Sequence, residues 1–309
     1  MKISLIDLGS NSARMYVTEI NENSYKILSK HRVMTKLSQG MGSEKILKEI
    51  PVSRTIDVLK NFADLSIKEN STILATATAA VRLAKNKDEF IEKVFNETNI
   101  KLNVISGETE AKLDFEGVLF GFPDIQDCLI TDTGGGSTEI IYVKNREIQN
   151  KISLPFGAVS LKEKFNNILD AEKAVEEELR KIEFLKDAYN IPIIGLGGSI
   201  SAIAAIDINI KNKNCNIHNY KINKNELSDL YKAIAKMSYE ELIKLKVEKE
   251  RTDTITFGCL PTYIISNYLN CPNLYISTFG LREGIISKII SNFSVVDINN
   301  MEQFLENIV

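Results

Sequence analysis

Residues 7–12 read DLGSNS and residues 132–137 read DTGGGS, so the pattern D-x-G-x-x-S occurs twice, at an offset of 132 − 7 = 125 residues. An apolar run precedes each copy, and a strand-like run, a polar turn and a further strand candidate follow it. These flanking runs lie at residues 3–6, 15–20 and 25–28 for the first copy and at 129–130, 139–143 and 147–154 for the second. Each copy therefore predicts a strand, a tight glycine turn and two more strands. A period this long indicates a duplicated domain rather than a solenoid.

Helical and strand-like patterns alternate through the rest of both halves. Apolar residues recur at helical spacing, and Asn86 with Glu89 resembles a capping box. We expect helices at residues 52–67, 86–95, 108–120, 170–189, 223–237, 253–269, 281–291 and 299–308, and strands at 101–105 and 191–196. This alternation predicts α/β domains with a cleft between them. The expected first domain comprises residues 1–122, joined by a terminal helix at about 292–309, and the second comprises residues 123–291.

The composition is that of a globular chain with room for two domains. Of 309 residues, 44% are hydrophobic and 26% are charged, which is enough for packed cores. The net charge of -3 argues against a sequence-independent nucleic-acid binder, because such binding needs a dominant basic face. The net charge does not exclude a polyanionic substrate, since a few convergent cations can line a positive cleft.

The cysteines and the apolar segments exclude other classes. Cys128, Cys215, Cys259 and Cys271 lack paired metal-ligand spacing, and only two histidines accompany them, so no zinc site is expected. Cys128 and Cys259 sit in apolar runs and are expected to be buried. The chain opens on a strand pattern without a signal-peptide pattern, and its most apolar later stretch, 193–206, is too short and interrupted to span a bilayer. We expect a cytoplasmic protein that does not contact a membrane.

The two Asp-led turns predict phosphate and magnesium binding. A glycine turn after a strand lets backbone N–H groups approach a phosphate that a side chain would block. Asp7 and Asp132, each at the end of a predicted strand, can hold Mg²⁺, while the following serine donates to a phosphate oxygen. One such turn is more often only a turn, but two matched copies favour two facing phosphate loops. The alternative is a structural duplication in which one copy is inactive.

A further glycine turn, GLGGS at residues 195–199, follows a strand pattern and precedes a helix of small residues. It predicts an anion site at the helix N-terminus, at Gly197 and Gly198. The spacing G-x-G-x-x-G is not met, which excludes the nicotinamide dinucleotide fingerprint, and no glycine turn ends as a Walker motif does. Residues 279–284, FGLREG, also open a predicted helix and include the cation Arg282.

The order of these motifs resembles the exopolyphosphatase/guanosine pentaphosphate phosphohydrolase (Ppx/GppA) family. The first four are DLGSNS at 7–12, ATATAAVR at 75–82, ISGETEA at 105–111 and DTGGGSTE at 132–139. The next four are SLPFGAV at 153–159, GLGGS at 195–199, RTD at 251–253 and GLREG at 280–284. One motif could arise by chance, whereas eight in order, from residue 3 to about 290, are specific.

The resemblance implies a fold, a reaction and a set of site residues. The fold is the superfold of sugar kinases, heat-shock ATPases and actin (ribonuclease H-like), with two duplicated domains, and the reaction is a Mg²⁺-dependent attack of water on a terminal phosphoanhydride. Glu110 becomes the catalytic base, although an acid early in a helix more often only complements the macrodipole. Asp132 and Glu139 would hold the metal, with Asp7 from the matching turn. The implied substrate-binding residues are Ser10, Asn11, Arg14, Arg82, Gly134, Gly135, Gly136, Ser137, Thr138 and Arg282, beside Gly197 and Gly198.

The sequence departs from the family pattern in a few places. Larger members append a C-terminal helical domain, and we expect a short form without it. Thr109 stands where an acid is common, so a second carboxylate beside Glu110 is missing. Thr133 and Ser199 are mild exchanges, and none of these changes removes a residue that the chemistry needs.

Several functions remain open at this point. The first expectation is release of terminal phosphate from inorganic polyphosphate, and the second is hydrolysis of guanosine pentaphosphate (pppGpp). A kinase of the same superfold would need an acceptor base and an adenosine pocket, which the turn at 195–199 keeps open. A non-catalytic actin-like nucleotide-binding module would keep the glycine turns and have no use for Glu110. The resemblance also implies that a homodimer is common.

Overall fold

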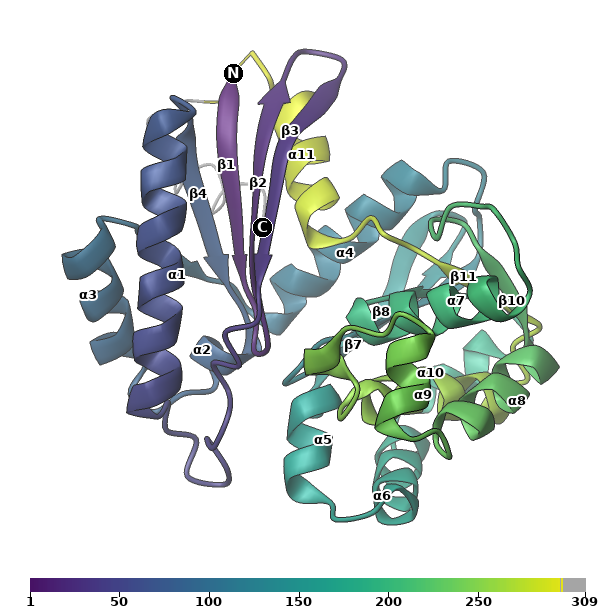
Figure 1. Cartoon of the computed structure of the whole chain (residues 1–309). Helices are drawn as coiled ribbons and strands as arrows, with labels where there is room; N and C mark the ends of the chain where they lie inside the picture. The colour runs from purple at the N-terminus through teal and green to yellow at the C-terminus, as the bar shows by residue number, and fades with distance from the viewer. Residues whose placement is uncertain (295, 297–309) are drawn as a thin grey trace. The chain divides into compact units, whose positions relative to one another are not determined.

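The computed structural model describes residues 1–294 and 296. The chain forms two compact units, one made of Met1–Leu113 together with the chain from Leu281 onward, the other of Asp114–Gly280. Each unit contains one mixed β-sheet with helices packed on it (Figure 1). Among the described residues, no helix combines the length and the apolarity that crossing a bilayer requires.

The first unit is built on a five-stranded sheet in the order β3-β2-β1-β4-β5, in which β1 is antiparallel to β2 and parallel to β4. Strand β1 is buried on both faces: Ile6 and Leu8 pack in one core with α1 and α3, and Ile3 and Leu5 pack in another with α11. The elements are β1 (Lys2–Leu8), β2 (Ala13–Ile20), β3 (Tyr25–Val33), α1 (Glu49–Lys68), β4 (Thr72–Ala77), α2 (Ala79–Arg82), α3 (Lys87–Thr98), β5 (Leu102–Val104) and α11 (Leu281–Ser291). Helix α4 (Gly107–Gly121) begins in this unit and ends in the second.

The second unit has a six-stranded sheet in the order β10-β11-β9-β6-β7-β8. Its core gathers apolar residues of the strands and of the helices that cover them, and α10 is fixed to β6 by a hydrogen bond of 3.0 Å between the hydroxyls of Thr131 and Thr262. The strands are β6 (Cys128–Thr133), β7 (Thr138–Lys144), β8 (Glu147–Leu154), β9 (Ile193–Leu196), β10 (Lys221–Asn223) and β11 (Asn273–Ile276). The helices are α5 (Ala158–Lys164), α6 (Ile168–Arg180), α7 (Gly198–Ile210), α8 (Lys224–Ile234), α9 (Tyr239–Lys244) and α10 (Ile255–Tyr268), with 3₁₀ turns at Glu183–Ala188 and Lys249–Arg251.

The two sheets repeat one strand order. Numbered within each copy, the first sheet runs 3-2-1-4-5, and the second repeats this order as β8-β7-β6-β9-β11, with β10 added at the edge. In both copies strand 2 is antiparallel to strand 1, and strand 4 is parallel to it. The duplication expected from the repeated turn and the ribonuclease H-like α/β fold implied by the family resemblance are therefore confirmed.

The boundaries between the units differ from the expected ones. The sequence placed the first boundary after residue 122 and the helix at 281–291 in the second domain, whereas the units meet within α4 and α11 belongs to the first unit. The reason is packing, because Ile285, Ile286 and Ile289 of α11 share a core with Ile3 and Leu5 of β1. The terminal helix expected at 299–308 lies outside the described residues.

Two helix predictions were wrong in detail. The helix expected at 170–189 ends at Arg180 and gives way to a 3₁₀ turn. The capping box expected at Asn86 does not form, because the Asn86 side chain bonds both the N–H and the carbonyl of Leu47 instead. Cys128 and Cys259 are buried as expected.

Candidate active site

The two Asp-led turns have the same backbone geometry. Gly9 N–H donates to the Ser12 carbonyl at 3.0 Å, and Gly134 N–H donates to the Ser137 carbonyl at 3.0 Å. Each bond closes a four-residue turn between a strand pair, so Ser10 and Asn11 sit at the tip of one turn and Gly135 and Gly136 at the tip of the other. The predicted phosphate loops are thus built alike in both units.

Each turn is held from behind by the segment that follows the third strand of its copy. In the first unit, Ser38 N–H donates to the Ser10 carbonyl at 3.0 Å and Lys36 N–H to the Asn11 carbonyl at 2.9 Å. In the second unit, Ala158 N–H donates to the Gly134 carbonyl at 2.9 Å and Val159 N–H to the Gly135 carbonyl at 2.8 Å. Tying back the carbonyls fixes the shape of the loops, which favours their use as anion-binding loops.

Gly157 is required by this close approach. A Cβ atom at this position would lie 2.6 Å from the Gly134 carbonyl oxygen, well inside van der Waals contact. The glycine in the predicted SLPFGAV motif therefore allows the start of α5 to reach the second turn. Thr138 also fixes this segment, because its hydroxyl donates to the carbonyl of Phe156, next to Gly157, at 2.7 Å.

The charges beside the two turns differ. Asp7 lies opposite Arg14 in the β1–β2 register, and their charged groups are 3.6 Å apart. Desolvation raises the pKa of Asp7, and the guanidinium groups of Arg14 and Arg282 act in the opposite direction. Asp132 instead lies opposite Glu139 in the β6–β7 register, so two carboxylates share one face of the second sheet.

The acid pair of the second unit suits a magnesium ion better than Asp7 does. Mg²⁺ is usually held by one or two carboxylates together with substrate phosphates, and the side chain of Glu139 is oriented by the Ser153 hydroxyl at 2.7 Å. Asp7 faces Arg14 instead of a second carboxylate. Within the described residues no group of three or more acidic, histidine or cysteine side chains could hold a metal without such phosphates.

Glu110, the predicted base, is fixed by Arg82, a predicted phosphate ligand. Arg82 Nη1 donates to Glu110 Oε2 at 2.8 Å and to the Ile105 carbonyl at 3.0 Å. Glu110 lies in the first turn of α4, which Ser106 caps by accepting from Thr109 N–H at 3.0 Å. Thr109, which replaces a common acid, also bonds the Ser106 hydroxyl at 2.9 Å. The carboxylate is therefore held in one orientation within an 8% exposed position.

The third predicted arginine is also engaged by an acid. Arg282, at the start of α11, donates to the buried carboxylate of Glu283, and its guanidinium stacks on the Tyr16 ring at 3.8 Å from the centroid. Arg14, Arg82 and Arg282 thus each lie on a carboxylate of the first unit. These carboxylates orient the guanidinium groups. A phosphate bound there would contact guanidinium groups that also contact protein carboxylates.

Gly197 and Gly198 bring the start of α7 to Asp132. Gly197 has a left-handed φ of 98°, and a Cβ there would lie 2.6 Å from the Thr133 carbonyl oxygen and 3.0 Å from Asp132 Oδ1. A Cβ on Gly198 would lie 2.3 Å from the guanidinium of Arg251, which is 7% exposed. The two glycines therefore place a helix N-terminus and a buried cation beside the acid pair, as an anion site requires.

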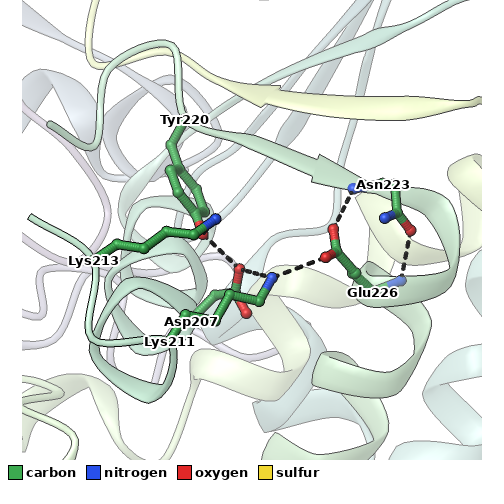
Figure 2. A network of polar contacts seen from close by, with 6 residues as sticks. All are labelled: Asp207, Lys211, Lys213, Tyr220, Asn223 and Glu226. Atoms are coloured by element: carbon green, nitrogen blue, oxygen red, sulfur yellow. Dashed lines mark hydrogen bonds and ion pairs between the residues drawn. The ribbon is translucent and has the colours of Figure 1, made fainter. Parts of the chain in front are cut away.

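The far end of α7 is fixed by a network of ion pairs and hydrogen bonds. Asp207 accepts from Lys211 and from the Tyr220 hydroxyl, each at 2.8 Å, and Lys211 also bonds Glu226 at 3.0 Å (Figure 2). Glu226 forms a capping box with Asn223 at the start of α8. Desolvation, followed by the bond to Asp207, raises the pKa of Tyr220 to about 12, so its hydroxyl stays a donor. The network holds α7 against β10 and α8.

Two groups near the turns were missed by sequence reasoning. The hydroxyls of Ser38 and Thr133 are buried and have no hydrogen-bond partner among the described residues, and each lies next to a glycine turn in sequence or through a backbone bond. Arg251, of the RTD motif, was expected to be one of the cations near the substrate, and the structure adds that it is buried.

The comparisons with known proteins agree with these motifs. A model of the Ppx/GppA phosphatase family matches residues 16–293. The chain belongs to the Ppx/GppA phosphatase family. The family prediction is confirmed, and with it the type of enzyme, an exopolyphosphatase-type phosphoanhydride hydrolase.

Three relatives illustrate the match. The chain is 31% identical to a bifunctional 3-dehydroquinate synthase/phosphatase of Fusobacterium nucleatum, over 93% of this chain and 46% of that protein, so it spans about half of this relative's length. It is 28% identical to a putative exopolyphosphatase of Haemophilus influenzae, over 96% of this chain and 94% of that one. The crystal structure of an exopolyphosphatase from Cytophaga hutchinsonii has the same fold, with a TM-score of 0.88 at 23% identity, covering 96% of this chain and 99% of that one.

Proposed function

We propose that this protein is a Mg²⁺-dependent phosphohydrolase that releases the terminal phosphate from inorganic polyphosphate. The observation that carries the proposal is Glu110, a carboxylate fixed by Arg82 at the start of α4. A buried carboxylate is normally paired in any role, but a general base must also point at its water, and Arg82 holds Glu110 in one orientation within the family motif at residues 105–111. Relatives described as exopolyphosphatases support the reaction class.

In the proposed reaction the protein positions groups and stabilises charge. Glu110 accepts a proton from water, the water oxygen forms a bond to the terminal phosphorus, and the bridging P–O bond breaks so that the shortened chain leaves as an anion. The glycine turn at 134–137 and the start of α7 at Gly198 hold phosphate oxygens by backbone N–H groups. Mg²⁺, held by Asp132 and Glu139, would neutralise charge on these oxygens when it is bound.

The arginines of the first unit are assigned to the substrate as well. Arg14 and Arg282 have side chains that are 34% and 16% exposed, and both guanidinium groups are already oriented by a carboxylate. An oriented guanidinium loses little conformational freedom when a phosphate binds. Their place beside the first glycine turn supports a role in binding the same polyanion.

The choice of polyphosphate over pppGpp rests on composition. A nucleotide enzyme must recognise guanine, usually with a stacking surface and placed polar groups. The chain has no Trp and 7% aromatic residues, and no motif indicates a guanine pocket. A polyphosphate enzyme needs only repeated positive charge.

The test is phosphate release from polyphosphate and from pppGpp, measured side by side with and without Mg²⁺. We expect release from polyphosphate that stops when EDTA removes the metal. Better hydrolysis of pppGpp would make the nucleotide the substrate. Release at an unchanged rate in EDTA would contradict the role of the metal.

A further inference from the structure

The first glycine turn is held from behind by an irregular segment, residues 34–40, whereas the second is held by the start of a helix. In the second unit the N–H groups that tie back the turn belong to Ala158 and Val159, in the first turn of α5. The helix fixes the direction of such N–H groups, which have no partner within it. In the first unit the same bonds come from Lys36 and Ser38, which no helix or strand includes. The direction of these two N–H groups therefore needs another support.

Arg54 of α1 supplies such a support. Its Nε donates to the Thr35 carbonyl at 2.5 Å, and its Nη2 lies 3.3 Å from the side-chain oxygen of Gln39. The hydroxyls of Thr35 and Ser38, in the same segment, are buried and have no hydrogen-bond partner among the described residues. Leu37 anchors the segment by packing in the core of the first unit. Apolar packing sets no peptide direction, and the guanidinium does.

The peptide unit Thr35–Lys36 lies between Arg54 and the turn. Its carbonyl accepts from Arg54, and its N–H donates to the Asn11 carbonyl at 2.9 Å. Hydrogen bonds in series strengthen one another, because each polarises the next group. Lys36 also has a left-handed φ of 49°, which is uncommon for a residue other than glycine. Such a conformation persists only where its surroundings hold it, and here both ends of the preceding peptide unit are bonded.

Tying back the carbonyls of the first turn sets the direction of its N–H groups. The carbonyls of Ser10 and Asn11 point to the irregular segment, which donates to both. In a trans peptide the C=O and the N–H point in opposite directions. The N–H groups of the same two peptide units, those of Asn11 and Ser12, therefore point away from the segment. In the part of the chain that the structure describes, neither N–H group has a hydrogen-bond acceptor. Successive N–H groups on a fixed turn form a site for an anion.

We propose that Arg54 is a positioning residue, which aims the N–H groups of Asn11 and Ser12 at a phosphate of the bound polyanion. It acts through the Thr35–Lys36 peptide unit and does not contact the substrate itself. The inference rests on the proposed function and adds a residue that this function did not include. Loss of Arg54 weakens substrate binding and spares the chemical step, because Glu110 and the second glycine turn have supports of their own.

The experiment measures kcat and KM of the whole protein for tripolyphosphate. Arg54→Ala should raise KM about tenfold, as expected when a directed hydrogen bond to a charged group is lost. The value of kcat should change by less than about threefold, because binding is weakened equally before and in the transition state. No rise in KM, or a fall in kcat without one, would overturn the positioning role.

The matched control is Arg146→Ala, which removes an arginine of the second unit that also holds a loop by its carbonyls. Arg146 Nη1 donates to the carbonyls of Pro123 and Ile125 at 2.5 and 2.9 Å. Within the described residues, none of its bonds reaches a glycine turn or the segment behind one. This variant should keep both constants, even where chemical denaturation shows as large a loss of stability as in Arg54→Ala. An equal rise of KM in the two variants would make the effect one of general stability and overturn the inference.

Arg54→Lys separates geometry from charge, and it also serves if Arg54→Ala does not fold. Lysine keeps the positive charge but lacks the planar fork that bonds Thr35 and Gln39 together, so KM should stay about threefold or more above that of the wild type. Salt screens a direct attraction between an exposed cation and the polyanion, whereas the ratio of the Arg54→Ala and wild-type KM values should stay within about twofold as salt is added. Full recovery in Arg54→Lys, or a ratio that falls to one in salt, would overturn positioning in favour of direct attraction.

Wild-type activity on tripolyphosphate tests the proposed function by itself. If the wild type does not hydrolyse it, equilibrium binding of tripolyphosphate to the wild type, Arg54→Ala and Arg146→Ala takes the place of KM. Weaker binding by Arg54→Ala alone would support the positioning role although the proposed reaction had failed. Equal binding by the three proteins, or no binding by the wild type, would overturn it.

Discussion

In the first unit Asp7 faces Arg14 across β1 and β2, and in the second Asp132 faces Glu139 across β6 and β7. The offset that relates the two aspartates also relates their partners, since 139 − 14 = 125. The backbone around these pairs is the same in both copies, down to the hydrogen bond that closes each turn at 3.0 Å. One copy therefore holds a carboxylate with a cation, and the other holds two carboxylates.

This difference shows how two copies of one turn can share a backbone geometry and still carry side chains with different roles. The backbone supplies N–H groups for anions in both copies, whatever the side chains are. Two carboxylates on facing strands are the kind of ligands that Mg²⁺ takes, so the second copy is the one to which we assign Mg²⁺ in the proposed function. In the first copy Asp7 has the guanidinium of Arg14 beside it, and we propose no metal there.

The largest effect is expected at Glu110, the proposed base. At the matching place after β11, α11 opens with Arg282 and Glu283, which also bond each other. Glu110→Gln keeps the shape but cannot accept a proton, so turnover should fall roughly 10²–10⁴-fold with the KM little changed. Glu108→Gln changes an exposed acid two residues away in the same helix turn, so it is the control and should keep its activity. Near-normal turnover of Glu110→Gln would contradict the assignment of Glu110 as the base.

The next effect separates the two aspartates. Asp132→Asn should raise the Mg²⁺ concentration for half-maximal activity about 10–100-fold, because it removes one of two facing carboxylates. Asp7→Asn should leave that concentration within about twofold, although it can lower affinity for the substrate by releasing Arg14. A Mg²⁺ titration of both variants measures the contrast. Equal shifts would mean that both copies hold the metal, and a shift in Asp7→Asn alone would reverse the assignment.

A smaller effect concerns the support of the second turn. Gly157→Ala places a Cβ against the Gly134 carbonyl, which should lower the free energy of unfolding by about 1–3 kcal/mol. Gly134→Ala is the matched control, since its Cβ would have 3.6 Å to the nearest atom, the Ser137 carbonyl oxygen. Chemical denaturation of both variants gives the difference. Equal stabilities would show that the loop and α5 move apart easily.

Much of the fold could be predicted because its signal is local. A strand, a tight turn and a returning strand leave their pattern within 20 residues, and the repeat of that pattern indicated the duplication. The unit to which α11 belongs could not be predicted in this way. Ile285, Ile286 and Ile289 make an apolar helix face, and nothing in that face says which sheet it covers.

The contacts of the candidate site likewise include some that follow from the local sequence and others that depend on tertiary packing. The Asp7–Arg14 pairing was available from the sequence, because in a hairpin closed at residues 9–12 positions 7 and 14 must be opposite. The contact between Arg82 and Glu110 joins two motifs 28 residues apart and depends on how α2 and α4 follow their strands. Three-dimensional packing alone also placed Arg251 against Gly198.

The smallest effect tests the comparison most directly, by giving the first copy the charges of the second. Arg14→Glu would put two carboxylates opposite each other on β1 and β2. Since the side chains of Asp7 and Arg14 are partly exposed, at 26% and 34%, exchanging attraction for repulsion should lower the free energy of unfolding by only about 0.5–1 kcal/mol in metal-free buffer. Combining it with Asp7→Asn removes the repulsion, so the double variant should be more stable than the sum of the single changes predicts. Denaturation of the four proteins in EDTA gives this coupling, and its opposite sign or its absence would show that the charge on this register pair does not distinguish the two turns.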